Sequence, residues 1–161
     1  MHRNHQSNQK KYVKKSLLQR FHTHKTATQY TPKNFVDIES LYEDIRQNLE
    51  ALLNARIRYI KNISAYPELM TSLARYGLKD FMHASFGTKV MQNKLCDEIK
   101  EIIGCFEPRV INTQVTLQNS DEDISRILKI RIEGTVKALN EKIPAVFESS
   151  MDLSKHTFSV E

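Results

Sequence analysis

The sequence predicts an α+β fold, in which N-terminal helices are followed by a small antiparallel β-sheet of three to four strands. Apolar residues recur three or four positions apart between residues 38 and 103, as on one face of an amphipathic helix. After residue 110 they alternate every second position, as they do in strands with one buried face. Helices that precede a run of strands are typical of the α+β class.

The composition favours a globular domain with an extension. The chain has 161 residues, of which 40% are hydrophobic and 27% are charged, and it is long enough to bury a core. No apolar run has the length of a membrane helix, and no apolar segment follows the basic start as it does in a signal peptide. We therefore expect no direct membrane insertion and a cytoplasmic location.

Charge divides the chain into a basic arm and a mildly acidic domain. Residues 1–35 hold eight Lys and Arg residues and no acidic residue, whereas the rest of the chain holds 16 basic and 19 acidic residues. We expect an arm and linker at residues 1–34, with residues 1–15 disordered when alone, and a folded domain at residues 35–161. The lysines of the arm suit phosphate contacts, but no aromatic stacking face accompanies them, so nucleic acid is an unlikely partner.

A short apolar segment interrupts the basic arm at residues 16–21. Three of its side chains, Leu17, Leu18 and Phe21, would share one side of a helical turn or two. So short a helix is not stable alone, which indicates a peptide that docks on another surface. A partner protein and the chain's own domain are equally open as that surface.

The first helix of the domain is expected at residues 38–57. Asp37 suits its N-terminal cap, and Ser40 with Glu43 has the spacing of a capping box, so both caps stay open. Arg46 and Glu50 are four residues apart and can pair on its outer face.

Two further helices are expected before the sheet. Pro67 suits the first position of a short helix, and Gly77 suits the left-handed position that ends it. The third helix is expected at residues 88–104, where Gly104 ends the apolar repeat. Its predicted apolar face consists of Val90, Met91, Leu95, Ile99, Ile102 and Ile103.

The strands are predicted from alternation, with turns at residues 119–123 and 140–142. The first strand is expected to place Ile111, Thr113, Val115 and Leu117 on one face. The second does the same with Leu128, Ile130, Ile132 and Val136, and the third with Ala145, Phe147, Ser149 and Met151. Gly134 indicates a bulge or a close neighbour, and residues 156–160 would add a short fourth strand. A sheet of this size has open edges that can accept a strand from a partner.

The junction between the last helix and the first strand carries Glu107, Pro108 and Arg109 between apolar residues. Pro108 cannot continue a helix, and the two charges predict a turn held by an ion pair. Arg56 is a further candidate to face Glu107. A carboxylate bound by arginine favours its charged form, which suits a structural clamp and not a general acid.

The sequence lacks the motifs of common enzymes and cofactor sites. It has no Gly-rich phosphate loop, no zinc pattern and no nucleophile elbow, and nothing pairs Glu107 with Asp37 or Asp80 as two sugar-cleaving carboxylates. Cys96 and Cys105 would lie on opposite helix faces as reduced, mostly buried thiols. We expect no enzyme activity, no cofactor, no metal and no small-molecule substrate; a peptidoglycan hydrolase and a basic-arm adaptor protein are the alternatives.

Four segments resemble the TssE family, and they occur in the family's order. Residues 16–21 resemble SLLDRL, residues 48–56 resemble DLEALLNTR, residues 72–81 resemble SvlnYGLPD, and residues 106–110 resemble FEPRL. The resemblance covers roughly residues 16–160. The chain departs from it at Gln19, where the family has Asp, at Lys79, where the family has Pro, and in its basic arm.

TssE proteins are small wedge proteins of the type VI secretion baseplate and are similar to the gp25-like wedge proteins of phage tails. The resemblance implies a non-enzymatic assembly component that contacts TssF, TssG and TssK proteins near the start of the contractile sheath. It also implies that the sheet offers an edge to the first ring of sheath subunits. Glu107 and Arg109 would then fix the helix-to-sheet turn or contact the wedge partners directly.

Overall fold

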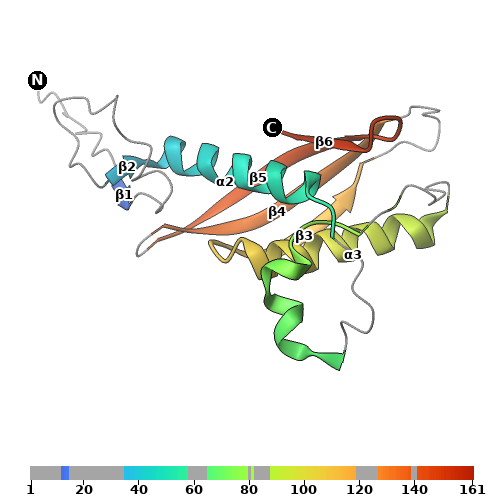
Figure 1. Ribbon diagram of the computed structural model, residues 1–161. Coiled ribbons are helices and arrows are strands. Elements are labelled where there is room, and N and C mark those ends of the chain that lie inside the picture. Colours follow the sequence, from blue (N-terminus) through green and yellow to red (C-terminus); the bar gives the residue numbers. More distant parts are fainter. Residues whose placement is uncertain are drawn as a thin grey trace, which may run out of the picture. The chain divides into compact units, whose positions relative to one another are not determined.

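The computed structural model describes residues 12–14, 35–57, 65–79, 81, 88–118, 127–138 and 141–161 (Figure 1). The chain forms two compact units, Met1–Asp44 and Ile45–Glu161. The apolar segment at residues 16–21, with Leu17, Leu18 and Phe21, lies outside the described residues.

The first unit contains a two-stranded antiparallel sheet. Strand β1, Tyr12–Lys14, pairs with strand β2, Phe35–Asp37. Residues 1–15 were expected to be disordered when alone; within the chain, Tyr12–Lys14 form β1 because β2 supplies partners for their backbone hydrogen bonds.

Helix α2, Ile38–Asn54, begins in the first unit and continues into the second. The Ser40 backbone N–H donates to Asp37 Oδ1 at 3.1 Å, so Asp37 is the cap. The helix ends three residues before the predicted position 57. It ends there because the chain becomes extended: Leu78 N–H donates to the Ala55 carbonyl at 3.0 Å, and Ile57 N–H donates to the Leu78 carbonyl at 3.1 Å.

The segment after Pro67 forms two 3₁₀ helices, where the sequence predicted one helix. They are η2, Pro67–Thr71, and η3, Leu73–Arg75. Ser72 separates them because it is extended and its hydroxyl accepts from Ala74 N–H at 3.3 Å. Gly77 has the positive φ that was predicted, 111°. A Cβ there would lie 2.6 Å from the Ala55 carbonyl, so the close approach to Ala55 also requires glycine.

Helix α3, Lys89–Phe106, extends two residues beyond its predicted end. Gly104 lies inside the helix, so the prediction that it ends the helix was wrong; Pro108 sets the limit. Val90 is 67% exposed and does not belong to the buried face. Cys96 is half-buried and Cys105 is exposed, so the expectation of mostly buried thiols was wrong for Cys105.

Four antiparallel strands follow in the order β3-β4-β5-β6, which confirms the α+β prediction. They are β3, Val110–Leu117; β4, Ile127–Ala138; β5, Glu141–Asp152; and β6, Thr157–Val160. Two residues of the predicted 140–142 turn, Glu141 and Lys142, already belong to β5.

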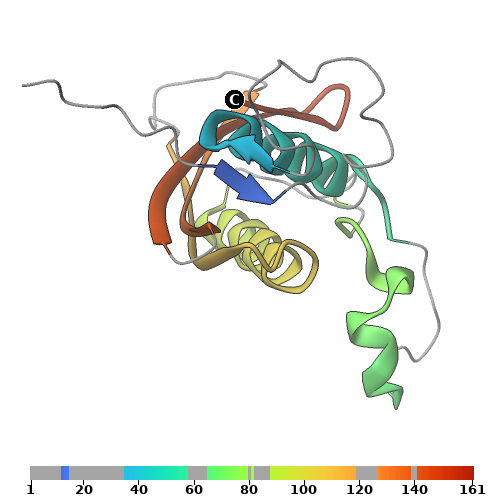
Figure 2. The ribbon, with the colours of Figure 1, turned by 90° about the vertical axis from the view of Figure 1, so that its left-hand side faces the viewer.

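One face of the sheet is buried and the other is exposed. The predicted inward residues of β4 and β5 are buried: Leu128, Ile130, Ile132, Val136, Ala145, Phe147, Ser149 and Met151. Helix α3 and the part of α2 after Ile45 lie on this face (Figure 2), and their buried side chains complete the core: Ile45, Leu49, Leu52, Leu53, Leu95, Ile99, Ile102 and Ile103.

Strand β3 contains a bulge opposite Gly134. Ile111 pairs with Thr135 and Gln114 with Glu133, so two residues of β3 oppose a single residue of β4. Asn112 in the bulge has a φ of 54°. Because the bulge adds one residue, the strand changes phase: Val110 and Thr113 are buried, whereas Ile111 is half-buried and does not share the face of Thr113. The Gly134 prediction is confirmed, since a Cβ there would lie 2.7 Å from Val110 Cγ1.

Candidate functional site

The Glu107-Pro108-Arg109 turn joins α3 directly to β3. Glu107 N–H donates to the Ile103 carbonyl at 2.8 Å and so completes the last turn of the helix. Val110 N–H donates to the Glu107 carbonyl at 3.0 Å, and Lys137 N–H of β4 donates to the Arg109 carbonyl at 2.8 Å. The turn is therefore fixed by backbone bonds to both the helix and the sheet.

The predicted ion pair within this turn is present and bidentate. Arg109 Nε lies 2.6 Å from Glu107 Oε1, and Arg109 Nη2 lies 2.6 Å from Glu107 Oε2. Glu107 is 4% exposed, whereas the Arg109 side chain is 26% exposed. Two parallel bonds to a buried carboxylate hold the guanidinium in one orientation, with part of it open to solvent.

Two other segments contact or approach the Glu107 carboxylate. Asn48 Nδ2 of α2 lies 3.4 Å from Glu107 Oε2. The Tyr76 ring packs edge-on against Phe106, with centroids 5.3 Å apart. Burial, and then the negative charge of Glu107, raises the pKa of Tyr76 above its usual value. Glu107 thus bonds α2 to the α3–β3 junction, and Tyr76, which follows η3, packs beside this junction.

Arg56, the other predicted partner of Glu107, makes hydrogen bonds elsewhere. Its guanidinium donates to the carbonyls of Leu53 and Ala55 at the end of α2, and to the carbonyl of His156 just before β6. Sequence reasoning identified Arg56 as a polar site residue, but the bond to His156 joins positions 100 residues apart and depends on the tertiary fold.

An open hollow of about 620 Å³ lies beside the turn, between the last turns of α3 and the start of β3. A Cβ placed on Gly104 would meet no atom within 4 Å, so the helix offers free space at this point. The hollow is lined by Lys100, Gly104, Pro108, Val110, Ile111, Asn112, Thr113 and Gln114. Most of these residues were not among the predicted site residues; the Gly134 signal for a bulge was the one indication of them.

The hollow borders the outer edge of β3, beside a buried hydroxyl that has no partner within the described part of the chain. Thr113 is 7% exposed, and its Oγ1 has no hydrogen-bond partner among the described residues. An unsatisfied buried hydroxyl is destabilising by about 1–3 kcal/mol. In the ladder with β4, Gln118 N–H bonds to the Lys129 carbonyl, so alternation directs the backbone groups of Val115 towards the outer edge.

None of the described helices is both long enough and apolar enough to cross a membrane. Among the described residues, no three acidic, His or Cys side chains gather into a group that would hold a metal ion. The candidate site consists of the Glu107–Arg109 turn, the adjacent hollow and the outer edge of β3.

Comparison with known proteins finds a family match and a similar solved structure. Residues 39–141 match the family of the baseplate wedge protein gp25. A solved structure titled "The baseplate complex from the type VI secretion system" has a chain similar to this one, with a TM-score of 0.52 and 16% sequence identity. The match covers 70% of this chain and 93% of that chain. No curated protein sequence matches.

Proposed function

This chain belongs to the family of the baseplate wedge protein gp25, and from that premise we propose that it joins a baseplate wedge to the first ring of a contractile sheath. The system would be a type VI secretion system or a related contractile injection system. The similarity to a chain of a type VI baseplate complex supports this assignment.

The observation that carries the proposal is the open hollow at the β3 edge, next to the Glu107–Arg109 turn. A strand from a sheath subunit would enter the hollow and bond to the outward backbone groups of β3. Strand addition supplies main-chain hydrogen bonds, and neighbouring pockets accept alternate side chains. The Thr113 hydroxyl would then gain the partner that it lacks within the described residues.

The turn gives a second contact surface on the same side of the sheet. Pro108 is exposed, and the Arg109 guanidinium is held in place with part of its surface accessible. Proteins of the TssF, TssG and TssK type would bind here, as the resemblance of the Phe106–Val110 segment implies. Leu17, Leu18 and Phe21 of the arm would provide a further contact with the wedge. The assembled complex would be cytoplasmic.

We also infer that the chain has a structural role and no enzyme activity. Both oxygens of the buried Glu107 carboxylate accept bonds from Arg109, so this group is a poor candidate for a general acid. Peptidoglycan fragments released by the purified protein above the level of a heat-denatured sample would contradict this inference.

Gly104 provides the sharpest test because larger side chains there extend into open space. Gly104→Phe would fill the hollow, whereas Gly104→Ala would leave most of it open, and neither creates a close contact at Cβ. We expect tagged Gly104→Phe protein, purified from its native cells, to lose sheath proteins while Gly104→Ala retains them. Equal recovery of sheath proteins with both variants would exclude the hollow as the sheath site.

Glu107→Ala tests the turn in the same assay. Loss of the carboxylate removes both bonds to Arg109 and the Asn48 contact, so we expect poor recovery of wedge proteins. Arg131→Ala is the control, because it removes exposed ion pairs on the other face of the sheet. If Glu107→Ala folds and assembles normally, this role of the turn is wrong.

A further inference from the structure

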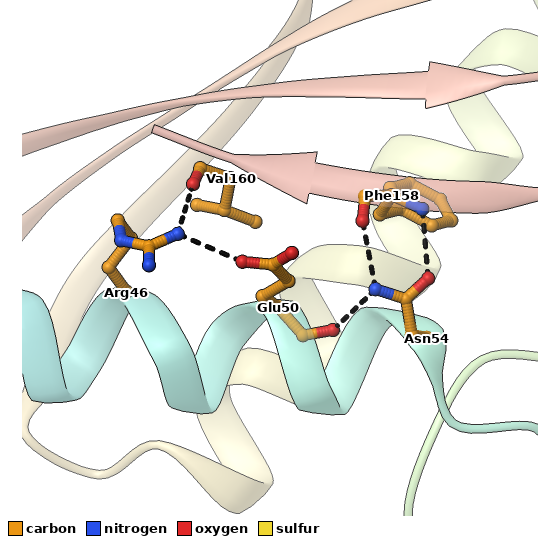
Figure 3. A network of polar contacts seen from close by, with 5 residues as sticks. All are labelled: Arg46, Glu50, Asn54, Phe158 and Val160. Atoms are coloured by element: carbon orange, nitrogen blue, oxygen red, sulfur yellow. Dashed lines mark hydrogen bonds and ion pairs between the residues drawn. The ribbon is translucent and has the colours of Figure 1, made fainter.

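The opposite edge of the sheet, at β6, is bound by side chains of α2 (Figure 3). Strand β6 pairs with β5 through residues 157, 159 and 161: Glu148 and Glu161 exchange N–H···O bonds of 3.1 and 2.7 Å, and the register places Ser150 opposite Ser159. Alternation therefore directs the backbone groups of Phe158 and Val160 away from β5. These are the groups that an added strand would need.

Asn54 occupies the position of an added strand residue. Its Nδ2 donates to the Phe158 carbonyl at 2.9 Å, and its Oδ1 accepts from Phe158 N–H at 2.9 Å. This is the two-bond exchange that a hydrogen-bonded residue pair makes in an antiparallel ladder. A single side-chain amide thus substitutes for the peptide groups of a neighbouring strand.

Two arginines bind the outward carbonyls on either side of Phe158. Arg46 Nη1 donates to the Val160 carbonyl at 2.5 Å, and Arg56 donates to the His156 carbonyl. Other bonds hold these donors in position: Glu50 Oε2 lies 2.8 Å from Arg46 Nη1, and the Glu50 carbonyl accepts from Asn54 Nδ2 at 2.9 Å. The donors come from consecutive turns of one helix and its end, so they are arranged before any partner arrives.

We propose that Arg46, Asn54 and Arg56 close the β6 edge, so that β6 cannot pair with the β6 strand of a second copy of the chain. Of the two outer strands, β3 and β6, β3 is then the one whose outward backbone groups can accept a strand. A subunit that accepts a strand at β3 but not at β6 can begin an assembly linked by added strands. The assembly cannot extend from its β6 side. The role of β3 in this statement rests on the proposed function; the closure of β6 does not.

The test uses the full chain with Asn54→Ala, the double variant Arg46→Ala/Asn54→Ala, and the control Asn93→Ala on the exposed face of α3. Amide hydrogen exchange is measured at Phe158 and Ser159, and mass is measured by light scattering over a range of concentrations. In the wild type, Phe158 should be protected equally at all concentrations. In Asn54→Ala, its exchange should become roughly fivefold faster at low concentration, while Ser159, bound to β5, changes little.

At high concentration the double variant should double in mass, and Phe158 should regain protection as β6 pairs with β6. A folded double variant that stays at its low-concentration mass would overturn the proposal, and so would concentration-dependent protection of Phe158 in the wild type. If the double variant does not fold, Asn54→Leu removes both the donor and the acceptor while nearly keeping the side-chain shape, and the same outcomes apply. The assay needs no baseplate partner, so it can succeed or fail independently of the Gly104 experiment.

Discussion

The two edges of one sheet differ in how their backbone groups are satisfied. Strand β3 has eight residues, a bulge and an adjacent hollow, and the Thr113 hydroxyl beside it has no partner among the described residues. Strand β6 has four residues, and side chains of α2 bind its outward groups. Helices cover the same face of both strands, so burial of that face does not decide whether an edge is available.

What decides availability is the geometry of the neighbouring helix. Helix α2 and the residues just after it place an amide and two guanidinium groups within hydrogen-bonding distance of backbone carbonyls in and next to β6. Helix α3 does this near the end of β3, where the backbone of Leu117 hydrogen-bonds the Cys96 thiol. At Gly104 itself the helix carries no side chain, and the hollow remains. Four predictions test this contrast between the two edges.

The largest effect is expected for Gly77→Ala. A methyl group there would lie 2.6 Å from the Ala55 carbonyl at a φ of 111°, so the variant should lose about 3 kcal/mol or more of unfolding free energy. The displaced Ala55 and Arg56 should also weaken the closure of β6, seen as faster exchange at Phe158. Urea denaturation gives the stability. Gly104→Ala, which meets open space inside a helix, should instead gain up to about 1 kcal/mol.

Glu107→Gln should have the next largest effect. It replaces the charged acceptor of two 2.6 Å bonds with a neutral amide and removes the negative charge beside Arg109, which should cost about 2 kcal/mol of unfolding free energy. Arg131→Ala, whose ion pairs are exposed, should change stability by less than about 0.5 kcal/mol. Equal losses in the two variants would mean that the buried pair has no special role.

Thr113→Val should separate stability from assembly. The methyl group replaces a buried hydroxyl without a partner in the described structure, so unfolding free energy should rise by about 1 kcal/mol. If a sheath strand bonds this hydroxyl, the more stable variant should recover less sheath protein. Thr116→Val, at an exposed position of the same strand, should leave both quantities nearly unchanged. A gain in both would argue against a partner at Thr113.

The smallest effect is expected from the pair between Arg75 and Glu101, which connects η3 to α3 at 2.8 Å. The hydrogen bond from Arg75 lowers the pKa of Glu101 below its usual value of 4.5. A lowered carboxyl pKa stabilises the fold above the usual value, and this contribution is lost as pH falls through the folded pKa. Glu101 is half exposed, so Glu101→Gln should flatten the acid limb of the stability profile by less than about 0.5 kcal/mol.

Local patterns in the sequence were sufficient to predict the main helices and strands and the ion pair in the Glu107–Arg109 turn. Alternation identified the inward residues of β4 and β5, and the spacing around Pro108 predicted the Glu107–Arg109 pair. Both depend on neighbours within one element or one turn. The same reasoning misplaced Val90 and Ile111, because helix burial begins later than the apolar repeat and the β3 bulge shifts the phase of the strand.

The two edges could not be predicted in this way. Asn54 and Arg56 lie in the segment that resembles a family motif. Their partners, however, are about 100 residues away, in β6 and just before it. The hollow at β3 depends on where the bulge of one strand meets the last turns of α3. Such features arise from the pairing of distant elements, and no spacing within a single segment encodes them.

The bulge in β3 has a consequence for comparing and editing related chains. Asn112 and Thr113 together oppose Gly134. The alternation of inward and outward residues is therefore shifted by one position after the bulge. An ungapped alignment with a relative that lacks the extra residue would assign half of the strand to the wrong face. Deleting one residue at the bulge would restore a regular ladder and would remove the kink beside the hollow, whereas the same deletion in β4 or β5 would turn core residues outward.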